Sequence, residues 1–156
     1  MKKSLILAAI LAVVSVGQAI AQPRAVGVNI GYGFSASYQH SIGEANLVDV
    51  SLELPCFDGI GATATYDWIN PFGTKIPWNN KGEWNWSLGA GAGLGWNHGF
   101  YVGAVGHVGV SYDFWFPFQL SVDYRPNIGI WCGKGWCTFN DWGLYSGITI
   151  GARYLF

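Results

Sequence analysis

The strongest constraint on this chain is a two-residue alternation between apolar residues and small or polar ones. The clearest stretch is 84–96, where Trp84, Leu88 and Trp96 share one parity and Asn, Ser and Gly fill the other. Successive side chains of a β-strand point to opposite faces, so this pattern is typical of a strand with one apolar face. It recurs in eight stretches: 26–32, 34–39, 48–54, 60–68, 84–96, 102–113, 118–125 and 144–156. No stretch after residue 22 repeats with a helical period, and the sequence predicts an all-β fold.

The composition excludes two broad classes of protein. Charged residues make up 11% of the chain, aromatic residues make up 17%, and there are 23 Gly. Disordered chains are rich in charge and poor in aromatic residues, so an ordered fold is expected. The formal charge is −1 and no cluster of Lys and Arg exists to meet phosphates, so nucleic acid is not an expected partner.

The first 21 residues have the features of a secretory leader. A basic start at Lys2 and Lys3 precedes an apolar run from Leu5, and Ala19 and Ala21 are the small residues that a signal peptidase reads. The run is shorter than the roughly 20 residues of a membrane-spanning helix. The sequence predicts a Sec-type signal peptide over residues 1–21, cleaved in the mature protein, and one domain over residues 22–156.

Two kinds of eight-stranded barrel fit this pattern, and they differ in which parity faces inward. A soluble lipocalin-like carrier buries its apolar parity, whereas a membrane barrel turns it toward lipid. The polar parity here is mostly Gly, Ser, Thr and Asn, which make a poor water-facing surface, and many aromatic residues lie near strand ends, as in the interfacial girdles of membrane barrels. We therefore expect an eight-stranded antiparallel up-and-down transmembrane β-barrel, with the soluble carrier as the alternative.

The predicted leader, the eight strands and the terminal Arg153-Tyr154-Leu155-Phe156 together resemble the small eight-stranded outer-membrane β-barrel proteins of the OmpA and OmpX size class. The resemblance implies an outer-membrane location, lipid as the surroundings and a monomer. It also implies that the outer-membrane insertion machinery reads Tyr154 and Phe156 as an insertion signal. The expected outer turns at Gly33 and at 97–99 are short, which weakens a receptor or adhesin role.

Charged residues of the inward parity predict an ion network in the lumen. One group is expected near the periplasmic end: Asp49, Asp67, Asp113 and Arg153. A second is expected near the outer end, namely Glu53, Asp123 and Arg125, with His107 between the two. A lone carboxylate in a confined lumen is costly to ionise, so Arg–carboxylate pairs are expected, including one between Arg153 and a periplasmic-side acid. A gate or a weakly cation-attracting lumen is the functional alternative.

The same parity is rich in Gly, which supports two interpretations. Gly relieves crowding in a narrow, strongly coiled barrel, or it leaves a narrow watery cavity or channel. Eight strands enclose just enough room for side chains to fill, so an open pore is not the default expectation.

The cysteines suggest one local crosslink. Cys132 and Cys137 lie in the last predicted outer loop, and export to an oxidising space makes a disulfide between them plausible. Cys56 is expected on the same rim and could compete for a partner, so the connectivity stays open. The spacing does not fit a zinc pair, and neither a metal nor a cofactor is expected.

The expected function is that of an outer-membrane barrel with a structural role or a narrow small-solute pore, without a catalytic centre. One alternative is a surface binding or adhesion module that uses Trp131 and Trp136; the soluble carrier is another. The least favoured is a lipid-modifying enzyme built on His107 and Ser111, which lie four residues apart on the inward parity.

Overall fold

The computed structural model describes residues 22–31, 33–55, 59–73, 81–141, 144 and 147–156. The predicted signal peptide, residues 1–21, lies outside these residues. The eight expected strands are present, two further strands, β8 and β9, lie in the last predicted loop, and all ten are paired antiparallel. They are β1 (Gln22–Ile30), β2 (Gly33–Ser41), β3 (Asn46–Pro55), β4 (Ile60–Pro71), β5 (Glu83–Trp96), β6 (Phe100–Asp113), β7 (Phe118–Tyr124), β8 (Asn127–Gly133), β9 (Trp136–Asn140) and β10 (Ile148–Leu155).

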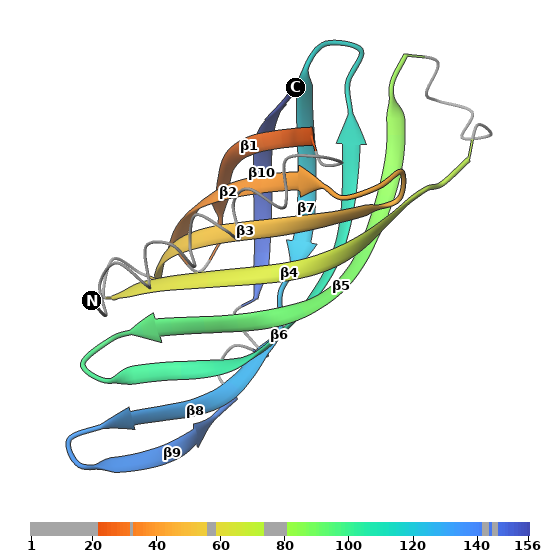
Figure 1. Cartoon of the computed structure of the whole chain (residues 1–156). Coiled ribbons are helices and arrows are strands. Elements are labelled where there is room, and N and C mark those ends of the chain that lie inside the picture. Colours follow the sequence, from red (N-terminus) through yellow and green to blue (C-terminus); the bar gives the residue numbers. More distant parts are fainter. Residues whose placement is uncertain (1–21, 32, 56–58, 74–80, 142–143, 145–146) are drawn as a thin grey trace, which may run out of the picture.

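The segments form a closed eight-stranded barrel. Each of β1 to β6 pairs with the next along the chain, and β10 lies between β1 and β7 (Figure 1). The long β6 has two partners on one side, because Val108–Asp113 pairs with β7 and Phe100–Val105 pairs with β8. β7 and β8 are thus one interrupted strand, whereas β9, in the described part of the chain, pairs only with β8 and ends that side of the sheet.

The last predicted outer loop, which holds Cys132 and Cys137, is not a loop, because residues 127–140 form the hairpin of β8 and β9. Pro126 lacks an N–H and interrupts the ladder between β7 and β8, although its carbonyl still accepts a hydrogen bond from the Gly106 N–H at 2.8 Å. Lys134 and Gly135 both have positive φ, as a two-residue turn of this hairpin requires. Ile128 and Ile130 continue the outward apolar parity, which the surrounding Gly and Cys obscure in the sequence.

The strands are strongly staggered. A row of paired residues that starts at Asn29 runs through β2 to β5 and reaches Tyr101 on β6. In the other direction, the row runs through β10 and β7 and reaches Ser111 on the same strand. The two ends of the row are ten residues apart, which is the shear of the barrel. Such a shear tilts the strands, so residues equally far from two strand ends lie at different heights.

The two ends of the barrel carry different connections. We call the end with the C-terminus and the β2–β3, β4–β5 and β6–β7 connections the terminal end. There the Phe156 N–H donates to the Arg24 carbonyl at 2.9 Å, and the Leu155 N–H donates to the Pro117 carbonyl at 3.2 Å. The opposite end, with the β1–β2, β3–β4, β5–β6 and β8–β9 turns, is the distal end.

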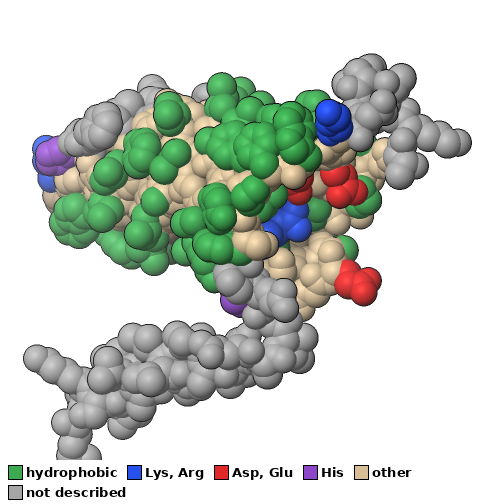
Figure 2. Space-filling model, turned by 90° about the horizontal axis from the view of Figure 1, so that it is seen from above, with side chains coloured by type: hydrophobic (Ala, Val, Ile, Leu, Met, Phe, Trp, Pro, Cys, Tyr) green, Lys and Arg blue, Asp and Glu red, His purple; other side chains and the backbone are tan. Residues whose placement is uncertain are grey.

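Burial is inverted relative to a water-soluble domain. Among the described residues, the buried hydrophobic side chains are only Ala25, Leu47 and Val105, whereas the interior holds Ser, Thr, Asn, Gln, His, Asp and Arg. Large apolar side chains of the other parity are exposed along every barrel strand. Figure 2 shows them spread over the side of the barrel, with the visible charged side chains gathered toward its ends.

Aromatic side chains cluster at both ends. At the terminal end, Phe114 packs within 6 Å, between ring centroids, of Tyr112, Trp115 and Phe118 around the β6–β7 connection. Trp96 and Phe100 are exposed at the distal end. No helix in the described part of the chain is long and apolar enough to span a membrane.

Candidate functional site: a buried charge chain and an adjoining cavity

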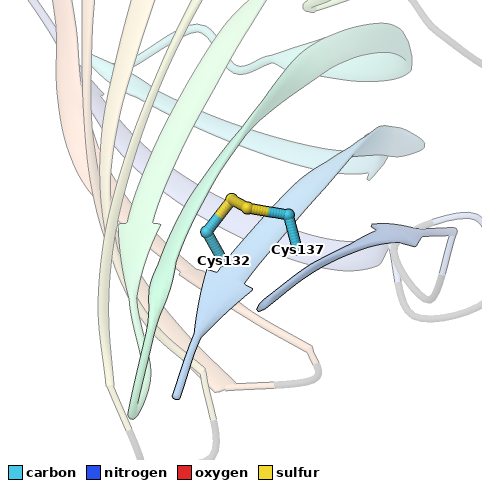
Figure 3. The surroundings of a disulfide bond; sticks show 2 residues. All are labelled: Cys132 and Cys137. Carbon is cyan, nitrogen blue, oxygen red and sulfur yellow. A yellow bond between two sulfur atoms is a disulfide. The ribbon is translucent and has the colours of Figure 1, made fainter. Parts of the chain in front are cut away.

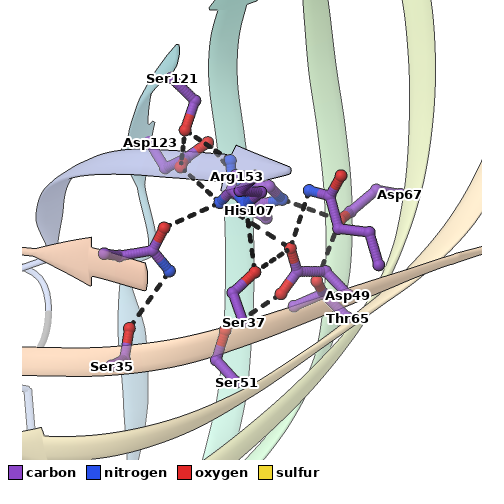
Figure 4. Close-up of polar contacts among 12 residues, drawn as sticks. Ser35, Ser37, Asp49, Ser51, Thr65, Asp67, His107, Ser121, Asp123 and Arg153 are labelled. Carbon is purple, nitrogen blue, oxygen red and sulfur yellow. Dashed lines mark hydrogen bonds and ion pairs between the residues drawn. The ribbon is translucent and has the colours of Figure 1, made fainter. Parts of the chain in front are cut away.

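Six charged side chains from five strands and the β7–β8 junction meet at mid-height in the lumen. They form a sequence of alternating charge, which we call the charge chain: Arg125, Asp49, Arg153, Asp123, His107 and Asp67. The successive N–O distances along it are 3.1, 4.0, 2.9, 3.2 and 2.9 Å. All six side chains are buried, and Figure 4 shows most of them converging from opposite walls of the barrel.

Arg153 is the centre of the chain. Its side chain is 1% exposed, and all three guanidinium nitrogens donate hydrogen bonds. The closest carboxylate is Asp123 at 2.9 Å, while Asp49, the periplasmic-side acid in the sequence analysis, lies 4.0 Å away. The remaining acceptors are neutral: Asn29, Ser37, Gln119 and Ser121. These bonds offset the cost of burying the Arg153 guanidinium.

The carboxylates are equally well partnered. Asp49 accepts hydrogen bonds from Ser37, Gln39 and Ser51, at 3.0 to 3.3 Å, besides its contact with Arg125. Asp123 accepts one from Ser121 at 2.7 Å. Asp67 accepts one from Thr65 at 3.1 Å, although its Oδ1 has no hydrogen-bond partner among the described residues. Each acid of the chain therefore has at least one neutral donor in addition to a cation, which offsets part of the cost of burying the charge.

His107 joins two carboxylates. Its Nδ1 lies 2.9 Å from Asp67 and its Nε2 lies 3.2 Å from Asp123. Carboxylates only accept hydrogen bonds, so the Nε2 contact, which has hydrogen-bond geometry, requires a proton on Nε2. The Nδ1 contact with Asp67 is an ion-pair distance without hydrogen-bond geometry, and the two carboxylates together favour the imidazolium. With the imidazolium counted, three cations balance three anions.

The two charge groups expected from the sequence are not the groups that form. Asp49, Asp67 and Arg153 were expected apart from Asp123 and Arg125, but the shear of the barrel brings all five to one level. Asp113 and Glu53 lie outside the charge chain: Asp113 pairs with Arg24 at 3.2 Å, and Glu53 accepts a hydrogen bond from Thr63 at 3.0 Å.

Sequence reasoning missed Arg24 because its parity is outward. A register shift between Pro23 and Ala25 leaves Arg24 without an opposite residue on β2 and redirects its side chain toward Asp113. Pro23 next to a strand start was the available signal. The neutral acceptors around Arg153 were also missed; their inward parity was visible, but not their partners.

Glycines of the inward parity make room for the charge chain. Gly89 separates Asp67 from His107 in the ladder, and a Cβ there would collide with the Asp67 carboxylate. A Cβ at Gly109 would lie 2.5 Å from Asp123 and one at Gly27 would lie 2.7 Å from the Arg153 side chain. At these positions the glycines relieve crowding, the first of the two expected roles.

A cavity of about 540 Å³ occupies the distal half of the lumen. Its lining reaches from Arg125 of the charge chain to Asn97 and His98 in the β5–β6 turn. On the terminal side of the chain, a void between Gln39, His107 and Arg153 measures only about 10 Å³, room for one water at most. The lumen is thus a recess that the charge chain closes at its base.

A disulfide joins Cys132 to Cys137 across the β8–β9 hairpin (Figure 3). These residues are opposite one another in the ladder. Cys56 lies outside the described residues. The neighbouring Trp131 turns inward and donates its indole N–H to the Asn97 carbonyl at 3.2 Å, which ties the hairpin to the β5–β6 turn, whereas Trp136 is exposed.

The predicted insertion signal lies on the outside of the barrel. Tyr154 and Phe156 are both exposed at the terminal end, with ring centroids 5.5 Å apart. No described group of His, Cys, Asp and Glu side chains is arranged to hold a metal ion. No protein-family model, curated protein or solved structure matches the chain.

Proposed function

We propose that the protein is a monomeric bacterial outer-membrane β-barrel with a structural role, exported by its signal peptide and closed along its axis by the charge chain. The observation that carries this proposal is the inverted burial. Thirty-five large hydrophobic side chains are exposed among the described residues, against three hydrophobic residues buried. Burying one such side chain is worth about 1.5–3 kcal/mol, so lipid is a far better surrounding for this face than water.

The same observation disfavours a soluble carrier. A lipocalin-like protein would bury its apolar parity around a ligand and expose its polar parity, which is the reverse of this arrangement. Closure of the sheet fits a membrane setting as well, since backbone groups facing hydrocarbon need partners within the protein.

The charge chain favours a structural role over a pore. Its members fill the lumen at mid-height, and their mutual contacts fix six positions around the barrel wall. Catalysis gains no support from the site: both nitrogens of His107 face carboxylates, so neither is left to take a proton from Ser111.

Cell fractionation tests the location. We expect the mature protein to sediment with the outer membrane, to require detergent for extraction, and to migrate faster on a gel when the sample is not boiled. A mature chain that stays folded and dissolved in buffer without any amphiphile would overturn the proposal.

Planar-bilayer recording tests the closed lumen. We expect protein that has inserted, as judged by protease protection, to give no stable conductance steps. Reproducible unitary steps would show that the charge chain leaves an ion path, and the small-solute pore would then replace the structural role.

A further inference from the structure

The distal cavity is too large to be a packing defect. Its volume of about 540 Å³ falls within the range of small-molecule binding sites, roughly 300–1,000 Å³. The charge chain forms its base and the short distal turns surround its mouth. The recess therefore has one closed end and one open end, and paired strands from β2 through β6 to β9 form its wall.

Glycines keep this recess open. One row of the ladder runs Glu53, Gly61, Gly95, Tyr101 and Trp131, and all five residues line the cavity. At about 4.8 Å per strand, Glu53 and Tyr101 are about 14 Å apart along the wall, with only the two glycines between them.

Gly61 differs from the glycines beside the charge chain. Beyond its chain neighbours, a Cβ at Gly61 would meet no heavy atom of the described residues closer than 3.6 Å, an ordinary van der Waals distance. The backbone would therefore accept a side chain at this position, and that side chain would project into the recess. Crowding therefore does not explain why residue 61 is a glycine. Its effect is to leave the space beside it open.

The interior charge is balanced except at the cavity wall. The charge chain is neutral as a unit, and Arg24 pairs with Asp113 at the terminal end. Glu53 is the remaining interior acid of the described residues. Its one hydrogen bond comes from the Thr63 hydroxyl, and no cation lies within ion-pair distance of it in the described part of the chain.

Two aromatic side chains stand on the wall opposite Glu53. The Tyr101 hydroxyl donates to Asn127 at 3.1 Å, and the Trp131 indole is held by Asn97. Both rings are fixed before any ligand arrives, which lowers the entropic cost of binding. An aromatic face attracts a cation and also packs against a flat body.

We propose that the distal cavity binds a small organic cation, an ammonium group carried on a flat apolar body. The ammonium pairs with the Glu53 carboxylate and the body packs in the glycine-floored space beside Tyr101 and Trp131. This inference goes beyond the structural role proposed above and depends only on the barrel interior. Fractionation tests the membrane location and ligand titration tests the cavity, so the failure of one proposal is distinguishable from the failure of the other.

Arg125 does not turn the cavity into an anion site. Its guanidinium lies 3.1 Å from Asp49 and donates to Ser51 at 2.6 Å, so its charge is paired within the charge chain, although its Nε and Nη2 have no hydrogen-bond partner in the part of the protein that the structure describes. An entering anion would have to compete with Asp49 and would also meet the Glu53 carboxylate. A cation would meet a carboxylate that no described cation touches, with Arg125 acting on it only at longer range.

The test uses the purified protein, isotope-labelled and held in non-ionic detergent micelles, and follows its amide NMR signals. Three probes share one ring and differ in charge: benzylammonium, benzyl alcohol and benzoate. We expect benzylammonium to shift the signals of Gly61, Gly95 and Tyr101 saturably, and at least tenfold more tightly than either other probe. Equal or tighter binding of benzoate or benzyl alcohol, or no saturable shift with benzylammonium, would overturn the proposal.

Two substitutions locate the site, each with a matched control. Glu53→Gln is expected to weaken benzylammonium binding at least tenfold, and Gly61→Leu to abolish it by filling the recess. Glu44→Gln and Gly43→Leu make the same changes in the β2–β3 turn at the terminal end, where Glu44 is exposed and Gly43 has open space around it. Both controls are expected to bind within twofold of the unaltered protein. Unchanged binding by Glu53→Gln, which alters no packing volume, would refute the site even if Gly61→Leu did not fold.

Discussion

Replacing Ile150 with Arg tests which solvent the apolar parity meets. Ile150 is 62% exposed on β10, and the exposed Tyr154 lies four residues nearer the terminal end on the same face. At about 3.3 Å per residue and a tilt of about 40°, Ile150 is about 10 Å further along the barrel axis than Tyr154. If Tyr154 lies at the membrane interface, Ile150 is close to the middle of an apolar band about 25 Å tall.

An Arg at that depth is expected to lower the free energy of unfolding by about 2–4 kcal/mol, which lowers the folding equilibrium constant about 30- to 700-fold. The measurement is reversible urea unfolding of the protein in phospholipid vesicles, followed by tryptophan fluorescence. Tyr154→Arg places the same charge at the expected interface and should lose only about 0–1 kcal/mol.

A water-facing surface predicts a different result. Substitutions at exposed sites in water usually change stability by less than about 0.5 kcal/mol, and an added Arg would improve solubility. If Ile150→Arg is as stable as the unaltered protein, or if the two Arg variants lose equal stability, the lipid-facing orientation is refuted.

Three further substitutions probe the interior and the hairpin. Arg153→Met leaves two buried carboxylates without their shared cation and should lower the free energy of unfolding by about 3–5 kcal/mol; a loss under 1 kcal/mol by urea titration would contradict the buried charge chain. Gly89→Ala should destabilise the barrel by about 1–3 kcal/mol because its Cβ overlaps a carboxylate and a carbonyl, whereas Gly61→Ala should be neutral or stabilising; equal urea midpoints would contradict this difference. Reduction of the Cys132–Cys137 disulfide should remove about 2 kcal/mol and should speed amide exchange in β8 and β9 only; alkylation without reduction that labels either cysteine would contradict the crosslink.

The strands were predictable because their signal is local. Alternation over 84–96 identifies β5 almost to the residue, since a strand with two unlike faces repeats every two positions. Alternation fails where it is weak: Gly129 and Gly133 dilute the pattern of β8, and the hairpin reads as a loop. The strand order also follows from the sequence, because short connections join antiparallel neighbours.

The interior was predictable only in part, because it depends on how the strands are staggered. Parity places Asp49, Asp123 and Arg153 inside, but their heights depend on the shear, which no single strand encodes. Two groups of charges were therefore expected where one charge chain forms. Arg24 shows a second limit: one unpaired residue beside Pro23 reverses the parity, and nothing in the alternation marks the site.

The inward glycines show why one residue type supports two interpretations from sequence alone. Gly89 and Gly61 belong to the same parity on neighbouring strands, yet a Cβ at the first would collide with Asp67 and a Cβ at the second would meet open space. The difference comes from their neighbours across the ladder. Gly89 lies between two members of the charge chain, whereas Gly61 lies between Glu53 and another glycine. Crowding in one half of the lumen and an open recess in the other therefore follow from a single placement, that of the six charged residues at mid-height.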